Sequence, residues 1–471
     1  MHKNILLLNP PGNKLYLRDY FSSLVSKGSY YWAPIDLLVL SGILGSKYNV
    51  RVLDAIVTKM KKEEALKKIL NMDIDTIIFL TGAVSWIDDL DFIEEIRRQK
   101  DVTTIAIGDI MLYHGLQILE EKPFLDAVLL NFITFDIVDF LEHSSESKKI
   151  NNLIYKNNGK IITGDKYLDE GTFKIPIPLH HLFPLEKYEI PQSMNHPISV
   201  IMTDFGCPFE CIYCPAANLP YRKRDIENTI EELKYIQSLK IKEVFIRDLT
   251  FAANHSHAIQ LCTRMLEEKI QLKWFCETRI DLMNEELLGL MKRSGCHAIW
   301  FGIETKNNAV LKNYGKVIDL EKTRKIFKLC KKLNIKTSGW FIIGLPGETK
   351  ESILETINFA KELDCDYVSF NMASPRVGTK FRHLALKEGW VIGEEKTLDS
   401  SVAYPLIHTD RLSRQQIWEL RNYAIRSFYL RPSYVIKRIL KLNSFRTFKV
   451  LMKNCIEILR TLFLLKRDNG D

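Results

Sequence analysis

The first 143 residues alternate between short apolar runs and longer segments in which apolar residues recur every three or four positions. The short runs are typical of buried β-strands, and the longer periodic segments are typical of amphipathic helices. Strands are expected at Ile5–Asn9, Val50–Leu53, Thr76–Leu80, Thr104–Ile107 and Ala127–Leu130. A helical segment follows each strand, which predicts an α/β domain over residues 1–145 with a five-stranded, doubly wound sheet.

A second alternation of strand and helix patterns covers residues 197–390. Strand-like runs occur at Ile198–Thr203, Glu243–Arg247, Lys273–Thr278, Ala298–Gly302, Thr337–Ile343 and Tyr367–Asn371. Helical patterns separate these runs, so the segment is expected to form parallel βα units with right-handed crossovers. In folds of this kind the functional side chains lie at the C-terminal ends of the strands.

Two segments fall outside these alternations. Residues 146–196 are polar and then rich in proline, which predicts an ordered linker between the domains. Residues 391–471 are expected to be helical at 413–430 and 432–466. The stretch 431–467 contains ten Lys or Arg residues and one acidic residue. Such a basic amphipathic helix either caps the protein with a solvated face or lies on an anionic membrane surface.

The composition is that of a folded globular protein, because 46% of the residues are apolar and 26% are charged. The net charge of +8 is small for 471 residues, and no nucleic-acid partner is expected. No apolar run reaches the roughly 18 residues that a membrane span needs. The apolar run near the N-terminus is too short for a signal peptide. The protein is therefore expected in the cytoplasm. The basic C-terminal helix could also attach it to a membrane surface.

The nine cysteines are unevenly distributed. None precedes Cys207, and Cys207, Cys211 and Cys214 fall within eight residues, whereas the other six are scattered in apolar patterns typical of core residues. Closely spaced cysteines in a reducing compartment indicate metal binding or catalysis. A zinc site would need a fourth ligand, and the nearby histidines lack the usual paired spacing. Three thiolates without a fourth favour an iron–sulfur cluster with one open iron.

This Cys-x-x-x-Cys-x-x-Cys motif, with Tyr213 before the last cysteine, resembles the signature of the radical S-adenosylmethionine (SAM) superfamily. The resemblance implies a partial (β/α)6 barrel in which Cys207, Cys211 and Cys214 hold a [4Fe–4S] cluster. It also implies that the fourth iron binds the amino and carboxylate groups of SAM. One electron from an external reductant, a ferredoxin or flavodoxin, would then cleave SAM to methionine and a 5′-deoxyadenosyl radical.

The later strand ends carry residues that the same resemblance assigns to SAM. Asp248 stands where the family often has a Gly-Gly-Glu and would accept from the methionine amino group. Arg279 suits a carboxylate, because its guanidinium donates two charge-assisted hydrogen bonds. Gly302 and Glu304 belong to a Gly-Ile-Glu-Thr segment that resembles the family's Gly-Ile-Glu-Ser, in which the Glu would accept from a ribose hydroxyl or an amine. The remaining SAM-binding residues are expected to be Tyr213, Ile343 and Pro346.

The N-terminal sheet resembles the cobalamin-binding domain that precedes many radical SAM barrels. No dinucleotide fingerprint or P-loop follows its strands. The residues expected near cobalamin are Asn9, Pro10, Pro11, Thr81, Gly82, Ser85, Gly108 and Asp109. The family's Gly-Gly-Pro is replaced here by Gly108-Asp109-Ile110, and its Gly-Glu-Gly-Glu is absent. The chain also lacks Asp-x-His-x-x-Gly, so no histidine is expected to ligate the cobalt.

These features predict a cobalamin-dependent radical SAM enzyme that transfers a methyl group to an unactivated carbon of a small-molecule or lipid-like substrate. The chain also resembles the anaerobic Mg-protoporphyrin monomethyl ester cyclases and hopanoid-associated members, so oxidative cyclisation or ring rearrangement is the alternative. A tRNA methylthiotransferase would carry further cysteines in its N-terminal half. A non-catalytic iron–sulfur protein is a further alternative. Such a protein would not need an iron with an open coordination position or polar side chains at the strand ends.

Overall fold

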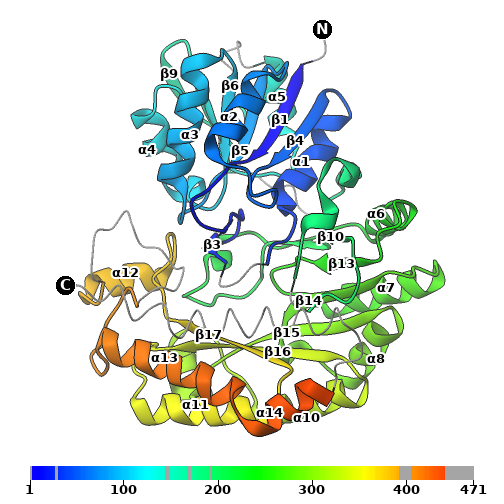
Figure 1. The fold of residues 1–471 in the computed structure, drawn as a ribbon, viewed down its shortest axis with the longest axis vertical. Helices are drawn as coiled ribbons and strands as arrows, with labels where there is room; N and C mark the ends of the chain where they lie inside the picture. The colour runs from blue at the N-terminus through cyan, green and yellow to red at the C-terminus, as the bar shows by residue number, and fades with distance from the viewer. Residues whose placement is uncertain are drawn as a thin grey trace.

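The computed structural model describes residues 3–26, 30–143, 149–166, 171–190, 192–391 and 405–440. Two α/β domains make up the molecule, and Figure 1 shows the N-terminal domain above the larger second domain. Each domain is built on its own sheet, and the strands of the two sheets do not pair with one another.

The N-terminal sheet has seven strands rather than the expected five. The five predicted strands are present and parallel; they are β1 (Asn4–Asn9), β4 (Asn49–Asp54), β5 (Thr76–Leu80), β6 (Thr103–Ile107) and β7 (Ala127–Leu129). An antiparallel hairpin of β8 (Leu153–Asn157) and β9 (Lys160–Thr163) extends the sheet beyond β7. Asn158 and Gly159 make its turn, both with positive φ, which is the geometry of a two-residue hairpin. The hairpin lies in residues 146–196, so that segment is not only a linker.

Helices cover both faces of this sheet because its strands are apolar on both sides. In β1, Ile5 and Leu7 belong to one buried cluster, whereas Leu6 and Leu8 belong to another. A strand that is buried on both faces is typical of parallel sheets. The helices are α1 (Ile35–Gly45), α2 (Lys62–Leu70), α3 (Trp86–Gln99), α4 (Met111–Glu121) and α5 (Asp136–His143).

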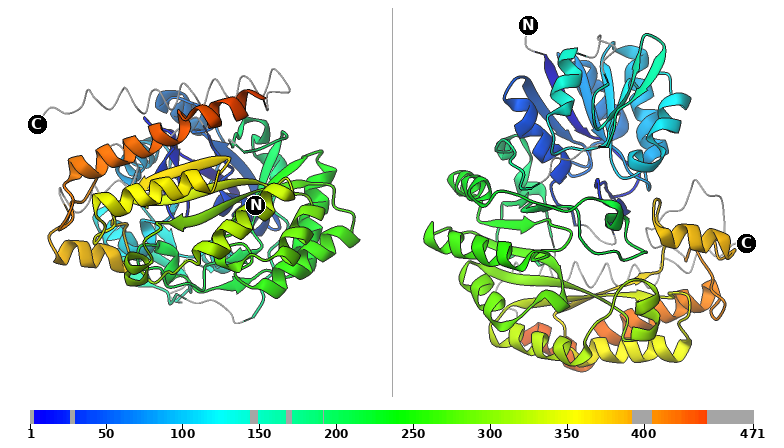
Figure 2. Two further views of the ribbon diagram at one scale, coloured as in Figure 1. Left: turned by 90° about the horizontal axis from the view of Figure 1, so that it is seen from below. Right: turned by 180° about the vertical axis from the view of Figure 1, so that it is seen from behind.

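The second domain is built on six parallel strands that pair in the order in which they occur along the chain. They are β10 (Ile198–Ile201), β13 (Glu243–Ile246), β14 (Lys273–Arg279), β15 (Cys296–Glu304), β16 (Lys336–Ile343) and β17 (Tyr367–Met372). The helices between them are α6 (Ile226–Ser238), α7 (His255–Glu267), α8 (Glu285–Arg293), α9 (Asn308–Asn313), α10 (Leu320–Lys332) and α11 (Lys350–Glu362). The sheet is curved in Figure 2, with these helices on its outer side and the N-terminal domain facing its inner side.

Residues 10–26 and 30–33 lie between the two domains and include the small hairpin of β2 (Tyr16–Leu17) and β3 (Leu24–Val25). Tyr20 packs against Phe205 of the second domain with ring centroids 6.0 Å apart. Asp19 forms a buried ion pair with Arg247 at 3.0 Å. The segment therefore joins the carboxyl edge of the first sheet to the inner side of the second.

The linker continues from the N-terminal domain to the second domain along residues 171–190. Leu179 N donates to Ser41 Oγ of α1 at 2.9 Å. The buried ring of His180 then contacts Ser199 Oγ at 2.7 Å and Glu232 Oε1 at 2.9 Å. Two adjacent residues in the middle of the linker are thus hydrogen-bonded, one to each domain.

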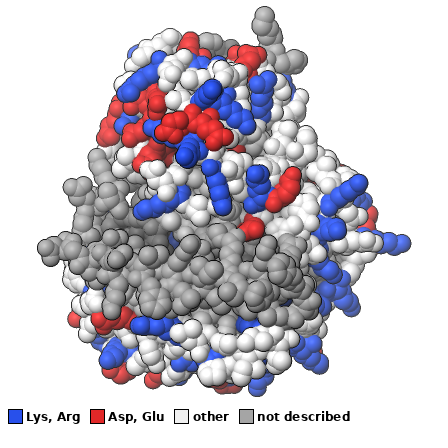
Figure 3. Space-filling model, viewed as in Figure 1, with Lys and Arg blue, Asp and Glu red and all other residues white. Residues whose placement is uncertain are grey.

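The described part of the C-terminal region contains the helices α13 (Arg414–Tyr429) and α14 (Pro432–Leu440), and α12 (Lys380–Lys387) precedes it. Helix α13 agrees with the prediction for 413–430, and α14 is the first part of the helix expected over 432–466. The rest of that basic segment lies outside the described residues. In the described part of the chain, no helix is long and apolar enough to cross a membrane. Figure 3 shows acidic and basic side chains side by side on the N-terminal domain.

Candidate functional site

The three clustered cysteines lie on a closed loop that follows β10. Strands β11 (Asp204–Phe205) and β12 (Arg222–Lys223) pair at the base of this loop. Gly206 begins it with φ +74°, and a Cβ there would stand 2.0 Å from the carbonyl oxygen of Pro220. A glycine is therefore required where the chain enters the cysteine loop.

The loop is held on the rim of the barrel by backbone contacts around Cys211. Ile212 N donates to Tyr314 O at 3.2 Å, and Phe381 N donates to Ile212 O at 3.0 Å. Gly315 has φ +73°, and a Cβ on it would lie 2.7 Å from the carbonyl oxygen of Glu210. The loop can approach this closely because residue 315 has no side chain.

The structure brings Cys207, Cys211 and Cys214 together at the rim. Burial raises the pKa of the Cys214 thiol to about 11 and also raises that of Cys207, so both are neutral thiols that would have to lose a proton in order to bind iron. Among the described residues, no three His, Cys, Asp or Glu side chains converge on a single metal ion. A [4Fe–4S] cluster does not need such convergence, because each of its thiolates binds a different iron. Three thiols on one loop fit the cluster.

Arg279, at the end of β14, lies beside the cysteines. Its Nη1 donates to Cys211 Sγ at 3.6 Å, and its guanidinium lies over the ring of Phe209 at 4.2 Å. Its Nε and Nη2 donate to the two carboxylate oxygens of Asp281 at 3.0 and 2.9 Å. All three guanidinium nitrogens thus donate within the protein, two to Asp281 and Nη1 to the cysteine loop.

Asp248 is buried and its carboxylate is used within the protein. It accepts from Thr203 N at 2.6 Å, from Asp204 N at 3.0 Å and from Thr203 Oγ1. Burial raises its pKa to about 6. These contacts hold the chain where it leaves β10 for the cysteine loop, so Asp248 positions the loop, and its role toward SAM stays a prediction.

Glu304 and Gly302 lie together at the end of β15. Lys316 Nζ donates to Glu304 Oε1 at 2.7 Å and to Gly302 O at 2.8 Å. Glu304 has φ +67°, a left-handed conformation that is rare for a residue with a side chain and often marks a functional site. Nothing in the sequence motif indicated Lys316, which comes from the loop after α9.

Ile343 ends β16 and leads into a tight turn that contains Pro346. Gly344 and Gly347 have φ +83° and +91° in this turn. The buried carboxylate of Glu348 accepts from Gly344 N and Leu345 N, both at 3.0 Å, and burial raises its pKa to about 7. Tyr314 OH donates to Pro346 O at 3.1 Å. Because Tyr314 O also accepts from Ile212 N, the turn and the cysteine loop share one support.

Most of the residues expected near cobalamin surround a buried ion pair between Arg18 and Asp89, whose Nη2–Oδ1 distance is 2.5 Å. Asp89 accepts from Thr81 Oγ1 at 2.8 Å and from Ser85 Oγ at 2.7 Å. Arg18 donates to the Asn9 side chain and to the backbone carbonyls of Pro10 and Pro11. These groups therefore fix the segment after β1 across the edge of the sheet.

Asp109, Gly82 and Gly108 hold the other end of the segment that follows β1. Asp109 accepts from Ser23 N at 2.7 Å, Ser23 Oγ at 2.8 Å and Ala83 N at 2.8 Å. A Cβ on Gly82 would meet Ser23 Cβ at 2.4 Å, and one on Gly108 would meet Thr81 O at 1.7 Å. The neighbouring hydroxyl oxygen of Ser22 is buried without a hydrogen-bond partner.

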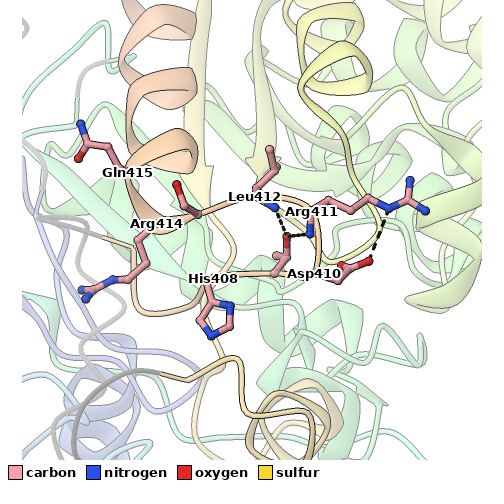
Figure 4. Close-up of a pocket in the computed structure, with 8 residues that line it drawn as sticks. His408, Asp410, Arg411, Leu412, Arg414 and Gln415 are labelled. Atoms are coloured by element: carbon pink, nitrogen blue, oxygen red, sulfur yellow. Dashed lines mark hydrogen bonds and ion pairs between the residues drawn. The ribbon is translucent and has the colours of Figure 1, made fainter.

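Figure 4 shows a surface hollow of about 550 Å³ in front of α13. Residues 408–415 line it, and Thr409 Oγ1 accepts from Arg411 N and Leu412 N within it. All of its lining comes from one continuous segment that leads into α13, and none of the residues expected to bind a cofactor lines it. It is therefore separate from the candidate site.

Comparison with known proteins agrees with this geometry. Residues 202–360 match the family model of the radical SAM superfamily. A protein of Pyrococcus horikoshii that is named an uncharacterized methyltransferase is 31% identical over 423 residues, which cover 88% of this chain and 91% of that protein. The anaerobic magnesium-protoporphyrin IX monomethyl ester cyclase of Rubrivivax gelatinosus is 25% identical over 362 residues. That similarity covers 73% of this chain and 64% of the cyclase, so the chain spans slightly less than two thirds of it.

The fold is also similar to that of a solved structure over nearly its full length. The cobalamin-dependent SAM radical enzyme OxsB, solved with aqua-cobalamin and SAM bound, superimposes with a TM-score of 0.70 at 15% identity. The match covers 99% of this chain and 72% of OxsB. The similarity therefore includes both domains and their order along the chain.

Proposed function

Since the chain belongs to the radical SAM superfamily, we propose that it is a cobalamin-dependent enzyme that transfers a methyl group to an unactivated carbon of a small-molecule substrate. One arrangement carries this proposal. The cysteine loop follows β10, Arg279 and Glu304 end β14 and β15, and the turn at Gly344 follows β16. The carboxyl ends of parallel neighbouring strands lie along one edge, so these groups border a common space.

The proposed roles follow from the contacts at that edge. When bound, the cluster and SAM supply a radical that removes hydrogen from carbon, and cobalamin supplies the methyl group. Cys207, Cys211 and Cys214 would hold the cluster, and Arg279 would lie beside its Cys211 ligand. Glu304, oriented by Lys316, would accept from a ribose hydroxyl. The backbone between Ile343 and Pro346 would lie along the adenine.

Cobalamin is proposed for the space between the carboxyl edge of the N-terminal sheet and the barrel. The support is the likeness to the fold of OxsB over both domains and the buried, unpartnered hydroxyl of Ser22 at this edge. Asn9, Thr81, Ser85 and Asp109 would act indirectly, because they fix the segment that faces the cofactor. An external ferredoxin or flavodoxin and a cytoplasmic location remain proposals of the same kind.

The reaction is tested with anaerobically reconstituted protein, SAM and dithionite. We expect 5′-deoxyadenosine to form, and we expect Glu304→Gln to raise the KM for SAM about tenfold through the loss of a charge-assisted hydrogen bond. Glu355→Gln is the matched control, since that carboxylate pairs with Lys306 on the surface. Absence of SAM cleavage with a loaded cluster and each reductant would exclude the proposed reaction.

A second candidate function, oxidative cyclisation, is favoured by the similarity to the magnesium-protoporphyrin cyclase. The product distinguishes the two reactions. Methylation adds one carbon to the substrate and depends on added hydroxocobalamin, whereas cyclisation removes hydrogen and leaves the carbon count unchanged. Mass spectrometry of the substrate pool with methyl-labelled SAM separates these outcomes.

A further inference from the structure

The inner face of the barrel carries a continuous set of aromatic rings, Phe245, Phe275, Trp300 and Trp340, which we call the aromatic wall. Phe245 and Phe275 are stacked, with centroids 4.7 Å apart and planes at 7°. Trp300 lies 5.5 Å from Phe275. Trp340 is stacked on Trp300 at 5.4 Å and 28°. The wall therefore spans four adjacent strands, from β13 to β16.

The register of the strands shows that the wall faces inward. Phe301, the residue after Trp300, packs against Phe327 of the outer helix α10 with centroids 5.4 Å apart. Successive side chains of a strand point to opposite faces, so Trp300 faces the inside. Trp32, from the segment between the domains, lies 5.8 Å from Phe245 on this inner side.

Along the strands, the wall lies two residues before the residues proposed for SAM. Trp300 pairs in register with Glu277, and two residues further along Gly302 pairs with Arg279. Two residues of a strand span about 7 Å. A ligand on the wall would thus lie next to SAM bound at the rim.

Two buried donors on this inner face have no hydrogen-bond partner. They are Trp300 Nε1–H and Arg247 Nε–H, on residues that are 5% and 7% exposed. Buried N–H groups are nearly always paired in native structures. Both groups can only donate, so what they lack is an acceptor.

The inner face remains accessible beside Trp300. Along β16 and β17, the inward residues Trp340, Ser369 and Asn371 are half-buried, whereas their neighbours facing the helices are buried. A molecule can therefore reach the wall, and its surroundings there are aromatic and polar at once.

The charges at Arg247 favour a neutral acceptor. Its Nη2 lies 3.0 Å from Asp19, and its Nη1 lies 3.4 Å from Glu277. One guanidinium is thus flanked by two carboxylates. A ligand carboxylate would add like-charge repulsion, whereas a carbonyl or a ring nitrogen would not.

From these observations we propose that the substrate has a planar, conjugated ring system with a neutral hydrogen-bond acceptor, which stacks on Trp340 and accepts from Trp300 Nε1. Arg247 provides a second donor at the edge of the same face. That the bound molecule is the substrate rests on the proposed function; the binding preference itself does not.

Three probes test the preference on full-length protein with the reconstituted cluster and SAM. They are 2-naphthamide, its saturated analogue decahydronaphthalene-2-carboxamide, and 2-methylnaphthalene, which lacks the acceptor. Equilibrium dialysis should show the tightest binding for 2-naphthamide. Trp300→Phe keeps a ring and removes the donor, so it should weaken 2-naphthamide about fivefold and leave 2-methylnaphthalene unchanged. Trp340→Phe, the matched control, should affect both planar probes alike.

The outcomes separate the two proposals. Equal affinities for the three probes in wild-type protein would overturn the inference whether or not the variants fold. SAM cleavage measured on the same preparation reports independently on the proposed function. A preference for 2-naphthamide without SAM cleavage would retain the binding site and exclude the reaction. An equal effect of Trp300→Phe on both planar probes would mean that water, not a ligand, satisfies this donor.

Discussion

Lys316 and Glu304 form an ion pair at the barrel rim, with an Nζ–Oε1 distance of 2.7 Å and side chains only 3% and 12% exposed. The same ammonium also donates to Gly302 O. A left-handed backbone costs a residue such as Glu304 about 1 kcal/mol. The ion pair offsets this cost and fixes the carboxylate that we propose for the ribose.

Lys316→Met should destabilise the protein by about 3 kcal/mol, because it leaves a buried carboxylate without its partner. Lys306→Met removes a cation of the same kind from the exposed pair with Glu355, and it should change stability by less than about 0.5 kcal/mol. Urea unfolding of the two variants measures the difference. Similar urea midpoints for the two variants would mean that solvent screens the ion pair between Lys316 and Glu304.

Gly108→Ala should destabilise the protein by about 3 kcal/mol, because φ is +142° and the new Cβ would overlap the Thr81 carbonyl oxygen. Gly289→Ala in α8 makes the same change where nothing lies within 4 Å, and it should stabilise the protein by about 0.5–1 kcal/mol. Thermal unfolding should therefore move in opposite directions for the two alanines. An unchanged melting temperature for Gly108→Ala would contradict the close contact between the ends of β5 and β6.

Asp36 should make stability fall as pH rises. Burial raises its pKa from 3.8 to about 8, while its oxygens accept from Tyr20 N and Leu37 N. The folded state keeps the proton to a higher pH than the unfolded state, so stability is full below pH 4 and is lost progressively as pH rises toward 8. Relative to Asp36→Asn, the wild type should lose about 1 kcal/mol per pH unit between pH 5 and 7. Urea unfolding at several pH values tests this prediction. The same pH dependence of the free energy of unfolding in wild type and Asp36→Asn would contradict it.

Cys211→Ala should abolish the bound iron, which we expect at about four atoms per chain. Cys330→Ala is the control, because Cys330 is a buried core thiol on α10. That variant should keep its iron and lose only some stability through the small cavity. Iron analysis after anaerobic reconstitution compares the two, and iron retained by Cys211→Ala would exclude this residue as a ligand.

The strand and helix pattern predicted much of the fold because the signals are local. Apolar runs marked all five parallel strands of the first sheet and all six of the second, since a strand buried on both faces reads as a continuous apolar run. The hairpin of β8 and β9 was missed because its outer strand, Lys160–Thr163, has only two apolar residues and both of its ends are exposed.

The assignment of individual side chains was less complete. Arg279 and Glu304 were predicted because a charged residue stood at an expected strand end, and the structure places them at the ends of β14 and β15. Asp248 stood in an equivalent place, yet its carboxylate accepts from the neighbouring Thr203 and Asp204. Whether a carboxylate is free or already paired depends on side chains that a strand-end pattern does not locate.

The sequence by itself determined the two α/β domains, the cysteine loop and the strand ends at which a site would form, because each depends on neighbours within a few residues. Only the tertiary structure decided which of those groups are available. Asp19 and Arg247 pair across 228 positions, and Arg18 and Asp89 pair across 71. Such contacts depend on the tertiary packing. A buried charge is stable only beside a partner of opposite charge, and that partner can lie anywhere along the chain.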